Sequence, residues 1–235
     1  MASTGNDSDG SCGRKSQIIA AFKEYYPSYD FLGDATGNGE VAQKFGCGDA
    51  EIFVLDTRTQ RPPEAATASE AAAAGRSMLG ADQLAWLKDG LSTSTATWKI
   101  IVSTVTASID ARDGVAYDNW AGFEEENQIM FDFLHDPNAP ITNVIMVSAD
   151  IHTGGGIDDG RNNRWGIPEM SISHTNLDAA STAINNGRTG TWSEVSWLGE
   201  RLCQCCCQLK GFYQALLAFI KTHTSSPSFH FFYVS

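Results

Sequence analysis

The sequence predicts an α/β fold, in which a sheet packs against helices that alternate with its strands along the chain. Three runs of β-branched and aromatic residues, at 51–55, 98–102 and 143–148, have the length of buried strands. Two helical patterns, at 79–91 and 123–134, separate these runs. Strands and helices that alternate in this way are typical of α/β domains.

The amino-terminal part is expected to contain a polar tail, one helix and a loop. Residues 1–15 are rich in Ser, Gly and Asp, which predicts disorder, and they lack the apolar segment of a secretory signal. Apolar residues at helical spacing predict a short amphipathic helix over 16–25, and Pro27 ends it. Three glycines predict a loop over 30–43.

The two central helices are predicted from their apolar faces. In the first, over 79–91, three leucines fall on one face and Gly90 marks the end. In the second, over 123–134, three glutamates occupy the first turn, where they complement the helix dipole. Residues 60–74 precede the first helix and contain two prolines and many alanines, so they form either a mobile surface loop or a short alanine-rich helix.

The strands are expected to carry polar residues at their carboxyl ends. The strand over 51–55 is followed by Asp-Thr-Arg at 56–58, and the second strand is followed by a polar loop over 103–114. A further short strand is expected over 169–173. No Gly-rich loop follows the first strand, which argues against a Rossmann-type nucleotide site.

The composition predicts one globular domain and limits its partners. The chain has 235 residues, of which 42% are hydrophobic, and one domain over 16–195 is expected. The net charge of -12 argues against nucleic-acid binding, because phosphate-binding surfaces need clustered Lys and Arg. The apolar run at 215–220 is far shorter than the roughly 18 residues that a membrane span needs. The chain as given is therefore expected to be soluble, while its localisation and oligomeric state stay open.

Asp150 and His152 form the most informative pattern in the chain, at the end of the apolar run over 143–148. Residues two apart in a strand point to the same face, so a carboxylate and an imidazole could bind one metal ion there. Three glycines follow at 154–156 and would allow a sharp turn or a close substrate approach. The alternative is that Asp150 caps a turn and His152 bonds the backbone.

Several stretches in fixed order resemble one family, the PhoD-like alkaline phosphatases, a branch of the calcineurin-like metallophosphoesterases. The resemblance covers roughly residues 18–178. Its stretches are Ala-Phe-Lys-Glu-Tyr-Tyr-Pro at 21–27, Phe-Val-Leu-Asp-Thr-Arg-Thr-Gln-Arg at 53–61, Ser-Met-Leu-Gly-Ala-Asp-Gln-Leu-Ala-Trp-Leu at 77–87, residues 96–102, Asp-Asn-Trp-Ala-Gly-Phe at 118–123, and residues 147–152.

The resemblance implies a hydrolase that acts on phosphate esters with bound metal ions, iron and calcium in the family. It implies a two-sheet sandwich, of which this chain carries one half, the carboxyl-terminal one. The family's Gly-Asp-x-His strand end corresponds to residues 149–152, with Ala149 in place of Gly, which assigns Asp150 and His152 as metal ligands. Such a metal would lower the pKa of a bound water and neutralise charge on the phosphate oxygens.

Four further side chains are candidates around this site. The resemblance places Asp118 and Trp120 at the active-site rim; the alternative is a capping Asp and a packing Trp. Arg161 or Arg164 could bind a phosphate oxygen, and the alternative is an exposed loop arginine.

Two histidines are further candidates beside these residues. His174 could act as an acid or a ligand, or could be structural. His135 is expected to be a dipole partner at a helix end.

The chain also departs from the family. No stretch corresponds to the family's amino-terminal half with its Asp-Asp-His-Glu motif, so an incomplete site is expected. From about Arg201 the sequence matches nothing in the family and crowds four cysteines into 203–207, too close for mutual disulfides. We interpret 196–235 as an atypical tail from a misread exon or a frame change, with a soft-metal or palmitoylation site as the alternative. The alternative function is an inactive fragment or a binding module derived from the family.

Overall fold

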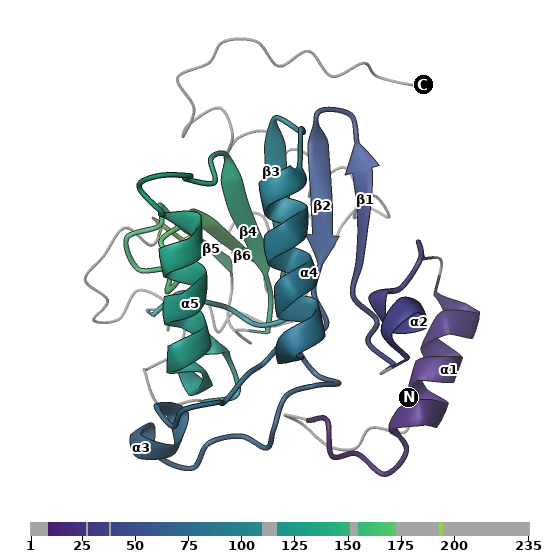
Figure 1. Cartoon of the computed structure of the whole chain (residues 1–235). Coiled ribbons are helices and arrows are strands. Elements are labelled where there is room, and N and C mark those ends of the chain that lie inside the picture. Colours follow the sequence, from purple (N-terminus) through teal and green to yellow (C-terminus); the bar gives the residue numbers. More distant parts are fainter. Residues whose placement is uncertain are drawn as a thin grey trace.

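The computed structural model describes residues 9–26, 28–37, 39–109, 117–150, 155–172 and 193–194. Helices and strands alternate from residue 50 to residue 148, and further strands follow (Figure 1). The helices are α1 Lys15–Tyr25, α2 Leu32–Thr36, α3 Ala68–Ala71, α4 Gly80–Thr93, η1 Trp120–Gly122 and α5 Glu124–Leu134. The strands are β1 Gln43–Cys47, β2 Ala50–Val54, β3 Trp98–Val102, β4 Val144–Ser148, β5 Gly155–Asp158, β6 Glu169–Ile172 and β7 Ser193–Glu194.

The strands form one sheet in the order β1-β2-β3-β4-β6-β5-β7. Strands β2, β3, β4 and β6 run parallel, and the three outer strands β1, β5 and β7 pair antiparallel with their neighbours. Helices α4 and α5 lie across one face of this sheet (Figure 1). The predicted α/β fold is confirmed, and the parallel strands bring their carboxyl ends to one edge.

The elements that the pattern of apolar residues did not predict include α2, β1 and β5. Helix α2 and strand β1 fall within or beside the loop expected over 30–43, and β5 begins at the glycines expected to form a turn. Strand β1 is half exposed and gains its pairing from β2, through register pairs such as Phe45 with Ile52. Tertiary pairing overrode the local signal at these places.

The segment at 60–74 combines the two alternatives left open. It is mostly loop, with the four-residue helix α3 inside it. The Thr67 side chain accepts a hydrogen bond from the Glu70 backbone N–H and caps this short helix. The polar amino-terminal residues 9–14 form turns, and the Gly10 N–H donates to the Arg61 carbonyl at 2.9 Å. The predicted domain boundaries at 15/16 and 195/196 stay predictions, because 1–8 and 195–235 lie outside the described residues.

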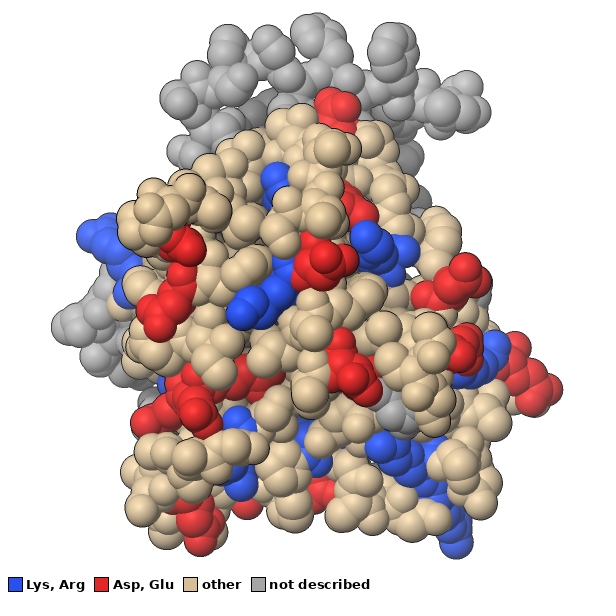
Figure 2. All heavy atoms as spheres, viewed as in Figure 1, with Lys and Arg blue, Asp and Glu red and all other residues tan. Residues whose placement is uncertain are grey.

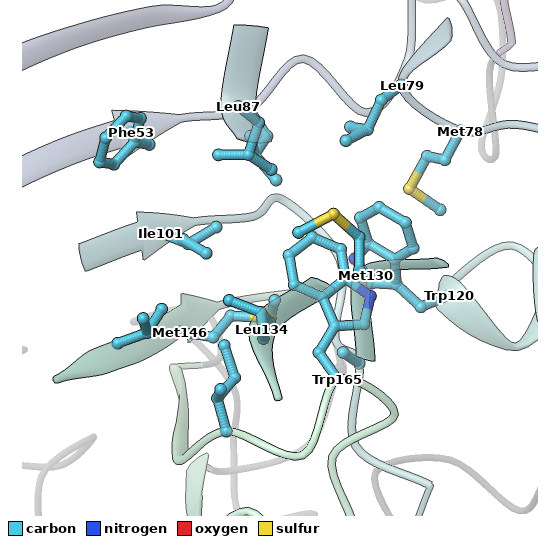
Figure 3. Close-up of a cluster of buried hydrophobic side chains, with 14 of the residues drawn as sticks. Phe53, Met78, Leu79, Leu87, Ile101, Trp120, Met130, Leu134, Met146 and Trp165 are labelled. Atoms are coloured by element: carbon cyan, nitrogen blue, oxygen red, sulfur yellow. The ribbon is translucent and has the colours of Figure 1, made fainter. Parts of the chain in front are cut away.

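The main core lies between the sheet and the helices α4 and α5 (Figure 3). Phe53 of β2, Leu87 of α4 and Ile101 of β3 are fully buried there. Trp120 and Trp165 meet edge to face with ring centroids 4.7 Å apart. The opposite face of the sheet carries a second apolar cluster, made of Trp98, Ile100, Ile145, Val147 and Met170. Both faces of the parallel strands are therefore apolar, as is typical of a parallel sheet.

The surface over α4 and α5 is mixed in charge. On the face drawn in Figure 2, acidic and basic side chains alternate with uncharged residues. Within the described ranges, no helix has the length and the apolar character needed to span a membrane.

Candidate active site

Three loops meet at the carboxyl edge of the parallel strands. They follow β2, β3 and β4, and they carry Arg58, Asp118 and Asp150 respectively. Open α/β sheets bind their ligands at this edge, because loops from neighbouring strands converge there. The carboxyl edge is therefore the part of the fold in which the predicted site residues come together.

Asp56 organises the first of these loops. Its carboxylate accepts hydrogen bonds from the backbone N–H groups of Val41 (3.0 Å), Arg58 (3.0 Å) and Thr59 (2.9 Å). An aspartate that bonds the N–H groups two and three residues ahead stabilises a turn. The turn directs Arg58 toward the loops that follow β3 and β4.

Arg58 joins two carboxylates from distant parts of the sequence. Its Nη1 donates to Asp118 Oδ1 at 2.8 Å, and its Nη2 donates to Asp150 Oδ2 at 3.0 Å. Nη2 also lies 3.5 Å from Asp118 Oδ2, so the guanidinium faces Asp118 with two nitrogens. The fork of N–H groups on an arginine suits this geometry, whereas the point charge of a lysine does not.

Arg61 holds Asp118 from the buried side. Its Nη2 donates to Asp118 Oδ1 at 2.5 Å, and its Nη1 donates to the Asp118 carbonyl at 2.6 Å. The Arg61 side chain is only 1% exposed, against 29% for Arg58. We call Arg58, Arg61, Asp118 and Asp150 the arginine–carboxylate cluster, in which Arg61 is the interior cation and Arg58 the one that reaches solvent.

The charges of the cluster decide the ionisation of Asp118. Burial raises the pKa of Asp118, but hydrogen bonds and charge from Arg58 and Arg61 outweigh burial and hold the pKa below its usual range. Asp118 is therefore a stable anion that positions two guanidiniums. It is poorly suited to donate a proton near neutral pH.

Asp150 lies two residues beyond β4 in an unusual backbone conformation. Its φ is 63°, in the left-handed region that few residues other than Gly, Asn and Asp adopt. Its side chain is 25% exposed and faces Arg58. Backbone strain of this kind persists only where the surrounding contacts hold the residue in place, and it is common at functional sites.

His152 and His174 lie outside the described residues. The predicted pairing of Asp150 and His152 on one face therefore stays a prediction. His135 is described: its Nε2 lies 3.0 Å from the Trp165 carbonyl, and its ring lies 4.6 Å from that of Phe131. Its contacts anchor the loop that carries Trp165 to the end of α5.

The arginines expected to bind phosphate have other contacts. Arg161 is 73% exposed, and its Nε (2.9 Å) and Nη2 (2.8 Å) both bond the carboxylate of Asp159. Arg164 Nη1 donates to the Ala107 carbonyl at 3.1 Å, and burial lowers the pKa of its guanidinium. Among the described contacts, neither arginine bonds Asp118 or Asp150.

Trp120 is fully buried in the core, two residues after Asp118. This is the packing role expected from the sequence as the alternative to a place at the active-site rim.

The described residues do not form a metal site by themselves. Within the described part of the chain, no group of three or more His, Cys, Asp or Glu side chains is placed to hold a metal ion. The carboxylates at the carboxyl edge are bonded to guanidiniums instead. Any metal on Asp150 would need ligands beyond this set, and it would have to compete with Arg58.

Arg58 and Arg61 were missed as site residues. The sequence did contain a signal for Arg58: the Asp-Thr-Arg run directly follows a buried strand. Its residues therefore lie at the same carboxyl edge of the sheet as the residues after β4. Sequence distance hid the partners, because 60 residues separate Arg58 from Asp118 and 92 separate it from Asp150.

Comparison with known proteins decides the family. The model of the family described as PhoD-like phosphatase matches residues 3–189, which is most of the chain. This chain belongs to the PhoD-like phosphatase family. It covers part of the family domain.

Two relatives show how much of a PhoD-like phosphatase the chain spans. It is 26% identical over 148 residues to alkaline phosphatase D of Bacillus subtilis (strain 168), and the match covers 57% of this chain and 25% of that protein. A solved structure titled "Structure of PhoD" has a similar fold, with a TM-score of 0.56 and 19% identity. That match covers 71% of this chain and 37% of the solved one. The chain thus spans about a quarter of the curated relative and little more than a third of the solved structure.

Proposed function

We propose that this chain carries part of a metal-dependent phosphate-ester hydrolase site at the carboxyl edge of its sheet. The observation that supports this most is the meeting of Arg58, Asp118 and Asp150, which come from the segments after three adjacent parallel strands, β2, β3 and β4. Membership of the PhoD-like phosphatase family supplies the reaction class. Enzymes of this kind need groups that orient a phosphate and neutralise its charge.

The residues of the proposed site have different roles. Asp150 and His152 are the proposed metal ligands, and calcium and iron are the proposed ions. Asp118 is a positioning residue that holds the guanidiniums. Arg161, from the sequence, and Arg58, from its contacts, are competing candidates for binding a phosphate oxygen. Arg58 is favoured because it touches the carboxylate of Asp150.

The site is proposed to be incomplete within this chain. Asp150 is bonded to Arg58, and one carboxylate with one imidazole is too small a set for a bridged two-metal centre. The second candidate function, an inactive fragment or a binding module derived from the family, is favoured by the same ion pair. A guanidinium on Asp150 neutralises the cluster without any metal.

Assays of ester hydrolysis and of bound metal distinguish these two candidate functions. The purified chain would be assayed on a chromogenic phosphate monoester and on a diester, with calcium and iron added, and its metal content would be measured. Activity that falls in both Asp150→Asn and His152→Ala, but persists in His135→Ala, supports the hydrolase. His135 is a suitable control because its described bond is to the Trp165 carbonyl. Folded protein that holds no metal and hydrolyses neither ester supports the fragment.

A further inference from the structure

Helix α1 turns an apolar stripe toward solvent. It lies at the periphery of the molecule beside α2, and none of its residues is buried (Figure 1). On its inner side the Phe22 ring lies 6.0 Å from the ring of Phe31. On its outer side an open groove, which we call the α1 groove, is lined by residues that include Arg14, Gln17, Ile18, Ala21, Phe22 and Tyr25. Tyr25 is 75% exposed. Exposed apolar surface of this kind often marks a site of protein contact.

The residues of the α1 groove are spaced symmetrically about the middle of the helix. Arg14, Ile18, Ala21 and Tyr25 are separated by four, three and four positions, so the stripe has the same spacing in both directions. If two copies of α1 pack antiparallel about a two-fold axis, Ile18 of one copy meets Ala21 of the other, and Arg14 meets Tyr25. A large side chain then faces a small one at the centre, which allows two helices to approach to about 8–10 Å.

The charges of α1 also suit an antiparallel pair. Arg14 directly precedes the helix and Glu24 lies in its last turn, so each charge has the sign that the dipole of its own helix disfavours. Both side chains are exposed, and neither makes a hydrogen bond or an ion pair within the described part of the chain. In an antiparallel pair each charge lies near the opposite end of the other helix, where both the dipole and the opposite charge favour it. Tyr25 also offers a ring face to the guanidinium of the other copy.

We propose that a second copy of this chain docks in the α1 groove and forms a two-fold symmetric dimer through an antiparallel pair of α1 helices. A two-fold interface brings the same surface of both subunits together, so that surface must complement itself. The α1 groove does so in side-chain size and in charge. The helix has 11 residues and is about 16 Å long, so the interface is small. We expect a reversible dimer with a dissociation constant of about 10–100 µM. The proposal does not depend on the chemistry at the carboxyl edge of the sheet.

Sedimentation of the full 235-residue chain tests the dimer. The concentration is varied from about 1 to about 300 µM, which brackets the expected dissociation constant. A reducing buffer prevents the six cysteines from cross-linking two chains. Ala21→Glu places a charge at the centre of the groove and should raise the dissociation constant about tenfold or more. Ala20→Glu is the matched control, because Ala20 is exposed on the same helix but does not line the groove.

Charge reversal tests the direction of the pair. Arg14→Glu and Glu24→Arg each place like charges opposite one another, so each should raise the dissociation constant about fivefold. Each suits the dipole of its own helix, so neither should lower the stability of the chain in urea. The double variant restores opposite charges between copies and should recover most of the affinity. The two positions lie about 15 Å apart along one helix, so contact within one chain cannot produce this recovery.

The outcomes are distinct. A wild-type chain that stays monomeric at about 300 µM overturns the proposal and leaves the α1 groove to a different polypeptide. A dimer that Ala21→Glu does not weaken, or that Ala20→Glu weakens equally, has its interface elsewhere and also overturns the proposal. A dimer that each charge reversal weakens and the double variant restores supports it.

Discussion

Arg58 Nη2 lies 3.0 Å from Asp150 Oδ2, although 92 residues separate the two in the sequence. The contact joins the loop after β2 to the end of β4, and it places a cation on the carboxylate that is proposed to bind metal. Asp150 has φ 63° at this point, so the ion pair is made by a residue whose backbone lies in the left-handed region.

Two replacements of Asp150 should distinguish the effect of its charge on calcium binding from the effect of its backbone conformation on stability. Asn accepts the left-handed conformation readily, whereas Ala does so at a cost of about 1 kcal/mol. Asp150→Asn should therefore unfold close to wild type in urea and lose calcium binding. Asp150→Ala should lose both calcium binding and about 1 kcal/mol of stability. Equal calcium affinity in Asp150→Asn and the wild-type chain would remove Asp150 from the set of ligands.

Replacement of Asp118 should destabilise the fold strongly. Asp118→Asn removes the carboxylate that bonds the buried guanidinium of Arg61, and the loss of one partner from a buried pair costs roughly 3–5 kcal/mol. Urea denaturation at pH 7 measures it. Asp34→Asn breaks the exposed pair with Lys23, and it should cost less than about 1 kcal/mol. Similar effects of the two substitutions would show that the Arg61 pair contributes little.

Asp118 should also contribute to loss of stability in acid. Its pKa in the folded chain lies below its ordinary value of 3.8, so the unfolded chain takes up a proton first as pH falls. The stabilisation is present above about pH 4 and is lost as pH falls through the folded pKa. Asp118→Asn should therefore show a shallower fall in stability below pH 4 than the wild type does. Equal slopes would contradict the assignment.

Glu126 should make the protein less stable as pH rises toward 7. This glutamate is 2% exposed and accepts hydrogen bonds from the backbone N–H groups of Met78 (2.5 Å) and Leu79 (3.4 Å). Burial raises its pKa from 4.5 to about 7, and these bonds only partly oppose burial. Because the folded pKa is the higher one, stability is complete below pH 4.5 and is lost as pH rises through 7. The loss should be on the order of 3 kcal/mol.

Glu126→Gln isolates this contribution. Its amide oxygen can accept the same backbone bonds without carrying a charge, so urea denaturation at pH 5 and at pH 8 should differ less in the variant than in the wild type. Glu124→Gln, at an exposed position in the first turn of the same helix, is the matched control and should keep the wild-type pH dependence. Asp158 and Glu169, whose pKa values burial also raises, leave a background slope in every variant.

Gly90 in α4 should resist replacement by alanine even though alanine favours helices. A Cβ at Gly90 would lie 2.6 Å from Cε1 of Phe53, which is fully buried against the sheet. Overpacking costs roughly 1–3 kcal/mol, which exceeds the gain of about 1 kcal/mol in helix propensity. Gly46→Ala in β1, where a Cβ meets nothing within 4 Å, should be neutral or slightly stabilising. A Gly90→Ala variant that melts above the wild type would contradict this packing.

The sequence by itself determined the class of fold and indicated where the proposed site lies. Buried parallel strands are continuous apolar runs, and the helices between them carry one apolar face, so both could be identified from local pattern. It also indicated the edge at which Asp150 lies, because polar residues after such strands collect at one end of the sheet. The family resemblance added the reaction class.

Only the tertiary structure decided which side chains meet. Strand β1 pairs because β2 offers it hydrogen bonds, and its own half-exposed residues have too weak a pattern to show this. Arg58 was passed over in favour of Arg161, because an arginine near Asp150 in sequence is a plausible neighbour and one 92 residues away is not. Local pattern follows from the backbone geometry of single elements, whereas ion pairs across the sheet depend on the order of its strands. That order places the loops after β2, β3 and β4 together and gives Asp150 its cation.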